Sequence, residues 1–116
     1  MEQTTITIGA AAELAATHLL LDRGYRIVER NFRCKAGELD IIARDGSILV
    51  FVEVRSRADA THGQAAEMIG PRKQRQVSRV AAHYLAARQP DYEEIRFDVI
   101  AITAGDAVLI QDAWRL

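Results

Sequence analysis

Apolar and polar residues follow two periods along the chain, one typical of helices and one typical of strands. Gly9–Arg23 is rich in alanine and leucine, which favour a helix, and Gly24 follows it as a C-terminal stop. A second helix is expected from Pro71, because apolar residues then recur three and four positions apart until Gln89-Pro90-Asp91 ends the pattern. Strands are expected at Tyr25–Cys34, Glu38–Ala43, Ile48–Arg55, Ile95–Thr103 and Val108–Gln111.

Short connections set the expected topology. Lys35-Ala36-Gly37 and Asp45-Gly46 are typical of tight turns, so the first three strands form an antiparallel meander. The helix before the fourth strand allows a crossover, so that strand can join the sheet in parallel. We therefore expect an α/β fold in the order α-β-β-β-α-β-β, with a five-stranded mixed sheet flanked by helices and residues 1–116 forming one domain.

Composition narrows the class of protein. The chain has 116 residues, 49% of them hydrophobic, which is enough for a core without disulfides or metals. Apolar runs stay well short of the ~18 residues that span a bilayer, and the first residues lack the pattern of a signal peptide. We expect a cytoplasmic protein without a membrane partner. Cys34 is the single cysteine, which excludes an intramolecular disulfide and a cysteine zinc cluster.

The net charge of −1 argues against nucleic-acid binding by bulk charge, but the charges are unevenly spread. From residue 72 to residue 89 there is no acid, and the basic residues there are Arg72, Lys73, Arg75, Arg79 and Arg88. The first four could bind phosphate groups, and the helix N-terminus at Pro71 would favour the negative charge of the phosphates. A solvated helix face explains them equally well.

The register of the central hairpin brings acids together. With Asp45-Gly46 as its two-residue loop, Asp40 lies opposite Phe51 and Glu38 lies opposite Glu53. Because side chains alternate, one face receives Glu38, Asp40, Glu53 and Arg55, and the other receives Leu39, Ile41, Ala43, Val50, Val52 and Val54. The acids repel each other, and the apolar residues Ile42, Leu49 and Phe51 on their face indicate partial burial, which raises the electrostatic cost.

A divalent cation would relieve this repulsion. Mg²⁺ and Mn²⁺ prefer oxygen ligands, and no histidine or cysteine lies near these acids in sequence to favour zinc. The pattern therefore indicates a Mg²⁺ (or Mn²⁺) site at Glu38, Asp40 and Glu53. The alternative is a solvated sheet face on which Arg55 makes an ordinary surface ion pair.

The hairpin carries a resemblance to a known family. Gly37-Glu38-Leu39-Asp40-Ile41-Ile42-Ala43, followed by Leu49-Val50-Phe51-Val52-Glu53-Val54-Arg55-Ser56-Arg57, resembles the small bacterial UPF0102 (YraN-like) family. The likeness covers nearly the whole chain and includes Glu13, Gly24-Tyr25-Arg26-Ile27, Asn31-Phe32-Arg33, Lys73 and Arg96-Phe97-Asp98-Val99. That family is similar to the restriction-endonuclease-like superfamily, especially archaeal Holliday-junction resolvases, which implies the same fold.

The resemblance also implies a site. Its pattern is an acid on the first helix, an aspartate, and Glu-x-Lys on the next strand, so Glu13, Asp40 and Glu53 would be catalytic metal ligands. Arg55 stands where the lysine usually stands, and arginine is a poor general base because it stays protonated. Three explanations remain open: the metal activates water alone, Lys73 reaches in from the second helix, or catalysis is weak or absent.

The implied function is a Mg²⁺-dependent endonuclease that hydrolyses phosphodiester bonds in DNA, including branched or structured DNA. The alternative is a non-catalytic nucleic-acid-binding module that retains the fold, and a protein-interaction subunit is a third class with no positive signal. Symmetric junction cutting would favour a homodimer.

Three other features have structural expectations. Ser56–Gly70 is long for a connection in a small domain, so we expect it to border the substrate path. Asp98 lies in an apolar strand, so we expect a buried acid paired with Arg96 or a basic helix residue. For Trp114 and Phe51, core packing or a dimer contact is favoured over stacking on bases.

Overall fold

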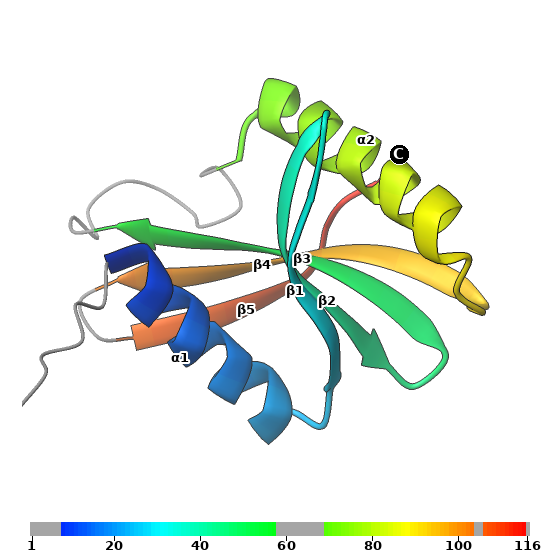
Figure 1. Ribbon diagram of the computed structural model, residues 1–116. Helices are drawn as coiled ribbons and strands as arrows, with labels where there is room; N and C mark the ends of the chain where they lie inside the picture. Colours follow the sequence, from blue (N-terminus) through cyan, green and yellow to red (C-terminus); the bar gives the residue numbers. More distant parts are fainter. Residues whose placement is uncertain (1–7, 58–68, 104–105, 116) are drawn as a thin grey trace, which may run out of the picture.

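A five-stranded mixed sheet lies between two helices (Figure 1). The computed structural model describes residues 8–57, 69–103 and 106–115. Its elements are α1 (Ile8–Asp22), β1 (Arg26–Cys34), β2 (Gly37–Asp45), β3 (Ile48–Arg57), α2 (Pro71–Arg88), β4 (Glu94–Thr103) and β5 (Asp106–Trp114). The strand order is β1-β2-β3-β4-β5, and β3 pairs with β4 in parallel while the other pairs are antiparallel.

The predicted fold class is confirmed, including the parallel fourth strand. The order α-β-β-β-α-β-β with a mixed sheet is compatible with a restriction-endonuclease-like fold. In the part of the chain that the structure describes, no helix is long and apolar enough to cross a membrane. Most of the predicted loop Ser56–Gly70 lies outside the described residues, so its expected place beside a substrate stays a prediction.

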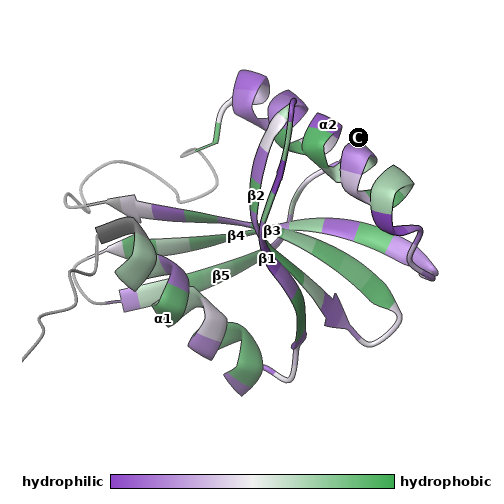
Figure 2. Ribbon diagram, in the orientation of Figure 1, coloured by the Kyte–Doolittle hydropathy of each residue, from purple (hydrophilic) through white to green (hydrophobic). Residues whose placement is uncertain are grey.

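Each face of the sheet has its own hydrophobic core, because alternate residues of β3 point to opposite sides. Leu49 and Phe51 pack beneath α2, where Tyr84 meets the Phe51 ring edge-on at a centroid distance of 5.8 Å. Val50 and Val52 pack on the other face, with residues of α1. Figure 2 shows the result, in which the central strands are largely hydrophobic and much of α2 is hydrophilic.

β5 runs further than the sequence indicates and ends at Trp114 rather than Gln111. The Trp114 ring stacks on Phe97 at 4.8 Å, and its indole N–H donates to the Ser78 hydroxyl at 3.3 Å. This packing continues the strand over polar residues that give no apolar signal of their own. The expectation that Trp114 and Phe51 are packed inside is confirmed, since both are buried.

The predicted register of the β2–β3 hairpin is wrong by two residues. Asp45 pairs with Ile48 and Ile42 pairs with Phe51, so the loop is Gly46-Ser47 rather than Asp45-Gly46. Gly46 has a φ of 63° at the first loop position, where a type II′ turn calls for glycine. Asp45 stays in the strand, where its carboxylate accepts a hydrogen bond from Arg96 at 3.1 Å. When the observed register is continued along β2 and β3, Asp40 lies opposite Glu53.

A polar network around Asp98 ties β2, β4 and β5 to Tyr25, the residue before β1. This carboxylate is fully buried and accepts hydrogen bonds from Arg96 Nε at 2.9 Å, Tyr25 Oη at 2.9 Å and the backbone N–H of Asp112 at 2.9 Å. The predicted pairing with Arg96 is confirmed. Burial is the main reason that the pKa of Tyr25 rises to about 12, with the neighbouring charge of Asp98 adding to it.

Removing the Asp98 carboxylate should destabilise the fold strongly. In Asp98→Ala the mostly buried Arg96 guanidinium, 13% exposed, loses a partner, and we expect the free energy of unfolding to fall by about 3 kcal/mol. Urea denaturation followed by Trp114 fluorescence measures this change. The control Asp91→Ala removes an exposed carboxylate and should stay within about 0.5 kcal/mol. Equal stability of the two variants would contradict a stabilising role for the network.

Candidate functional site

The hairpin of β1 and β2 bends at Asn31, and this bend shapes the site. Asn31 has a φ of 58°, which is uncommon for a residue other than glycine. On β2, Leu39 packs beneath α2 whereas Ile41 packs on the α1 face, although a regular strand would put both on one face. The prediction that Leu39 and Ile41 share a face is therefore wrong. The strand changes face at Asp40.

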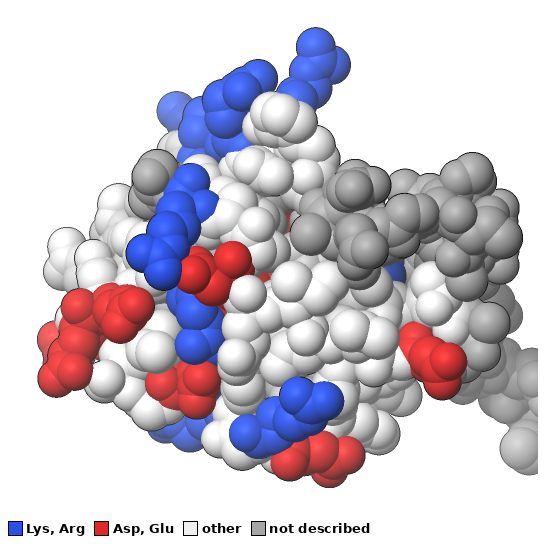
Figure 3. Space-filling model, turned by 180° about the vertical axis from the view of Figure 1, so that it is seen from behind, with Lys and Arg blue, Asp and Glu red and all other residues white. Residues whose placement is uncertain are grey.

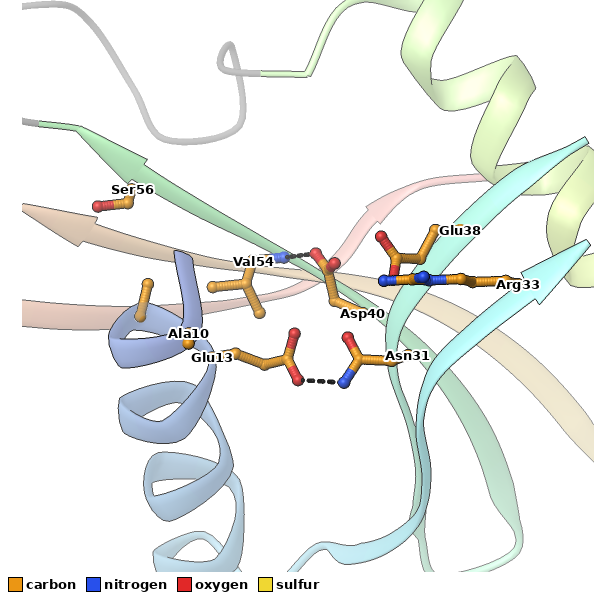
Figure 4. Close-up of a pocket in the computed structure, with 9 residues that line it drawn as sticks. Ala10, Glu13, Asn31, Arg33, Glu38, Asp40, Val54 and Ser56 are labelled. Carbon is orange, nitrogen blue, oxygen red and sulfur yellow. Dashed lines mark hydrogen bonds and ion pairs between the residues drawn. The ribbon is translucent and has the colours of Figure 1, made fainter. Parts of the chain in front are cut away.

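A pocket of about 510 Å³ opens at this bend, where α1 faces the strands (Figure 4). It is lined by Ala10, Ala12, Glu13, Asn31, Arg33, Glu38, Asp40, Val54 and Ser56. Asn31 Nδ2 donates to Glu13 Oε1 at 2.9 Å, and Arg33 Nε donates to Glu38 Oε2 at 2.9 Å. The structure thus brings Glu13 from α1 and Asp40 from β2 to one pocket, together with Glu38.

Asp40 and Glu53 form a pair of carboxyl groups across β2 and β3, in which Asp40 is half-buried and lines the pocket, whereas Glu53 is buried and is not among the lining residues. The backbone N–H of Val54 donates to Asp40 Oδ2 at 2.8 Å, and Glu53 is only 3% exposed. Burial and the charge of Asp40 raise the pKa of Glu53 to about 8, and burial also raises the pKa of Asp40. The pair hydrogen-bonds through a proton that Glu53 keeps at neutral pH.

Lys73, in the first turn of α2, lies beside Glu53 on the α2 face of the sheet. Its Nζ lies 3.6 Å from Glu53 Oε2 and 3.4 Å from Gln76 Oε1. Gln76 Nε2 in turn donates to the Ala36 carbonyl at 3.3 Å, at the tip of the β1–β2 hairpin. Gly37 lets the tip come this close, because a Cβ there would lie 2.7 Å from Gln76 Nε2. The hairpin tip and Lys73 are therefore held together.

The family comparison matches this region. A model described as "Uncharacterised protein family UPF0102" matches residues 12–102. The chain belongs to the UPF0102 family.

Several curated relatives cover most of this UPF0102 chain, and each is called a UPF0102 protein. One from Moorella thermoacetica is 45% identical over 102 residues, which is 88% of this chain and 85% of the relative. One from Syntrophus aciditrophicus is 43% identical over 112 residues, covering 93% and 88%. One from Geotalea daltonii is 44% identical over 115 residues, covering 95% and 91%. The predicted family is confirmed.

The basic residues singled out in this UPF0102 sequence divide into two groups. Lys73 turns inward to Glu53, whereas Arg72, Arg75 and Arg79 lie exposed on α2. Seen from behind, Lys and Arg side chains gather over this helix (Figure 3). Arg55 is half-buried on β3, and its charge slightly lowers the pKa of Glu53.

Asn31 and Arg33 line the pocket but were not predicted as site residues. One signal for both in the sequence is their place in the stretch Asn31-Phe32-Arg33 that resembles the UPF0102 family. An asparagine inside a β-rich run is a further hint, because asparagine tolerates positive φ better than most residues.

The donor atoms of the buried pair suit a hard cation. Among the described residues, no three His, Cys, Asp or Glu side chains converge as a ready metal cage. Mg²⁺ does not need one, because it keeps several waters and takes one or two carboxylates plus substrate phosphates. Asp40 and Glu53 offer only oxygen, and the proton they retain is one that a cation could replace.

The raised pKa of Glu53 predicts that stability falls as the pH rises. Between the ordinary glutamate pKa of 4.5 and the folded value of about 8, the folded state binds the proton that the unfolded state has released. The free energy of unfolding should therefore decrease with pH across this window. Urea denaturation at several pH values, in the presence of a chelator, measures the slope.

The slope should flatten in Glu53→Gln, which cannot ionise, and persist in the exposed control Glu93→Gln. A wild-type slope that survives in Glu53→Gln would contradict the assignment.

Proposed function

We propose that this protein is a Mg²⁺- (or Mn²⁺-) dependent endonuclease that hydrolyses phosphodiester bonds in DNA. The observation that supports this most is the Asp40–Glu53 pair, in which Glu53 is buried beside Lys73 and Asp40 lines a pocket that Glu13 also lines. A buried pair of acids that holds a proton at neutral pH is costly to maintain. Such a pair would bind a cation, and hydrolysis of a phosphodiester needs a cation too. This is a reason for the protein to keep the pair.

In this proposal Asp40 and Glu53 hold the metal ion, and Glu13 completes the site from α1. When bound, Mg²⁺ lowers the pKa of a water molecule and neutralises charge on the phosphate. The Val54 N–H fixes the orientation of Asp40, and Asn31 fixes that of Glu13. Glu13 would then orient the attacking water across the pocket.

Lys73 would supply the positive charge that a lysine on β3 supplies in the resembling pattern. Its ammonium group is close enough to Glu53 to stabilise it and to reach a phosphate oxygen beside it. Arg55 stays protonated and contributes charge only. We therefore assign Arg55 a supporting role and Lys73 the role next to the reacting groups.

The exposed arginines of α2 would bind the phosphate backbone. Arg72, Arg75 and Arg79 offer three cations on one helix of a chain whose net charge is −1. Local clusters of this kind hold nucleic acid in place without reading its sequence.

Branched or structured DNA is the proposed substrate because of the resemblance to junction resolvases, and symmetric cutting would favour a homodimer. We also propose that the protein acts in the cytoplasm. A non-catalytic nucleic-acid-binding module is the second candidate, which the arginine at position 55 favours.

Cleavage of labelled duplex, single-stranded, flap and four-way-junction DNAs tests the proposal. We expect cutting with Mg²⁺ or Mn²⁺ and none with chelator, because the phosphate charge is then not neutralised. Asp40→Asn and Glu53→Gln should each lower the rate by at least about a hundredfold. Asp22→Asn, which alters an exposed acid at the end of α1, is the control and should cut normally.

Two companion measurements separate the candidates. Mg²⁺ should raise the melting temperature of the wild type but not of Asp40→Asn, since only the wild type binds it tightly. DNA binding on a gel without cutting by the wild type would exclude the nuclease for these substrates and favour the binding module.

Lys73→Gln should lower the single-turnover cleavage rate by about a hundredfold, because a charge beside the reacting phosphate is lost. Lys73→Arg should keep more of the rate, since the charge remains. Arg23→Gln removes a positive charge from an exposed residue outside the pocket lining and is the charge control. If Arg55→Gln lost more activity than Lys73→Gln, the assignment of the two residues would be wrong.

A further inference from the structure

The side chains that line the pocket include three acidic residues and one basic residue. Among the nine described residues that line it, Glu13, Glu38 and Asp40 are acidic and Arg33 alone is basic. Nucleic acid is a polyanion, so it meets strong repulsion from such a surface unless cations offset it. Arg33 is the one positive charge that the protein itself contributes to the pocket lining.

The bend at Asn31 determines where Arg33 lies. Phe32 is buried beneath α2, with its ring edge-on to Tyr84 at 5.2 Å. The next residue of a strand points to the opposite face, so Arg33 faces the pocket. In Figure 4, Asp40 lies between Glu13 on α1 and the Arg33–Glu38 pair on the hairpin. Arg33 is thus fixed in place by its buried neighbour, on the opposite side of Asp40 from Glu13.

The ion pair that Arg33 makes is easily exchanged. Arg33 and Glu38 face each other across β1 and β2, and their side chains are 78% and 39% exposed. Exposed pairs of this kind contribute little to stability. Glu38 has a further effect, because its charge raises the pKa of both Glu13 and Asp40. Glu38 therefore adds to the repulsion inside the pocket, and Arg33 offsets it.

We propose that Arg33 binds a phosphate of the nucleic acid at the rim of this pocket and leaves Glu38 to do so. Guanidinium groups bind phosphate through two parallel hydrogen bonds, which lysine cannot make. Glu38 holds Arg33 in position before the nucleic acid arrives and competes with the phosphate for it. This inference rests on the proposed function only in that the pocket receives nucleic acid, and it does not require cleavage.

Opposite effects of two substitutions test the inference. Binding of a short labelled DNA duplex and of a four-way junction is measured by fluorescence anisotropy in Ca²⁺, with intact DNA checked on a gel. We expect Arg33→Gln to weaken binding at least about tenfold and to reduce the salt slope by about 1. Glu38→Gln should tighten binding, because one acid and one competitor for Arg33 are lost.

If the Arg33–Glu38 ion pair had only a structural role, loss of either partner would change DNA affinity in the same direction. Arg33→Lys, which keeps the charge but not the planar fork, should fall between wild type and Arg33→Gln. Arg26→Gln removes an exposed arginine from the same strand, outside the pocket lining, and is the matched charge control. Melting temperatures of all variants should stay close to that of the wild type.

The outcomes separate this inference from the proposed function. Weak binding by Arg33→Gln in a protein that never cuts DNA would support the phosphate contact and exclude the nuclease. Normal binding by Arg33→Gln in a protein that cuts DNA would overturn the phosphate contact alone. Equal losses in Arg33→Gln and Arg26→Gln, weaker binding by Glu38→Gln, or no DNA binding by the wild type would also overturn it.

Discussion

The repulsion between Asp40 and Glu53 constrains the elements around them. Two carboxyl groups that meet across β2 and β3, of which Glu53 is buried and Asp40 half-buried, cannot both carry a charge without compensation. The Val54 N–H and the Lys73 ammonium group supply part of that compensation, and a retained proton supplies the rest. A fold that only needed a stable sheet would be better served by apolar residues here, which is the reason behind the proposed cation site.

The same constraint accounts for the way the two halves of the chain meet. Lys73 reaches Glu53 only because α2 lies across the sheet with its first turn over the end of the hairpin. Gln76 and Gly37 hold the hairpin tip against that turn, and Asn31 bends the hairpin toward it. The residues that shape the backbone here are therefore as important to the site as the acids. Burial of Phe32 and Leu39 beneath α2 stabilises the bend.

Periodicity was sufficient to predict the elements, the mixed sheet and the parallel β4, because each depends on patterns within one segment or on the length of a connection. It could not predict the hairpin register. A shift of two residues leaves every side chain on its face, so loops at Asp45-Gly46 and at Gly46-Ser47 satisfy the same apolar pattern. The contact that favours the observed register, between Asp45 and Arg96, joins segments far apart in sequence. The change of face at Asp40 was missed because it depends on one unusual dihedral angle at Asn31.

The site residues also divide into those that the sequence could predict and those that depend on contacts between distant segments. Asp40 and Glu53 came from the hairpin pattern as well as from the resemblance, and Glu13 came from the resemblance alone. The role of Arg55 remained open because sequence places residues beside their chain neighbours rather than their neighbours in space. A charge requirement at a buried acid can be met from any element that reaches it, since electrostatic attraction depends on distance and surroundings and not on order along the chain. Lys73 lies 3.6 Å from Glu53 and belongs to a different element. An arginine at position 55 therefore does not by itself imply an inactive site, because a lysine from α2 stands beside the same carboxylate.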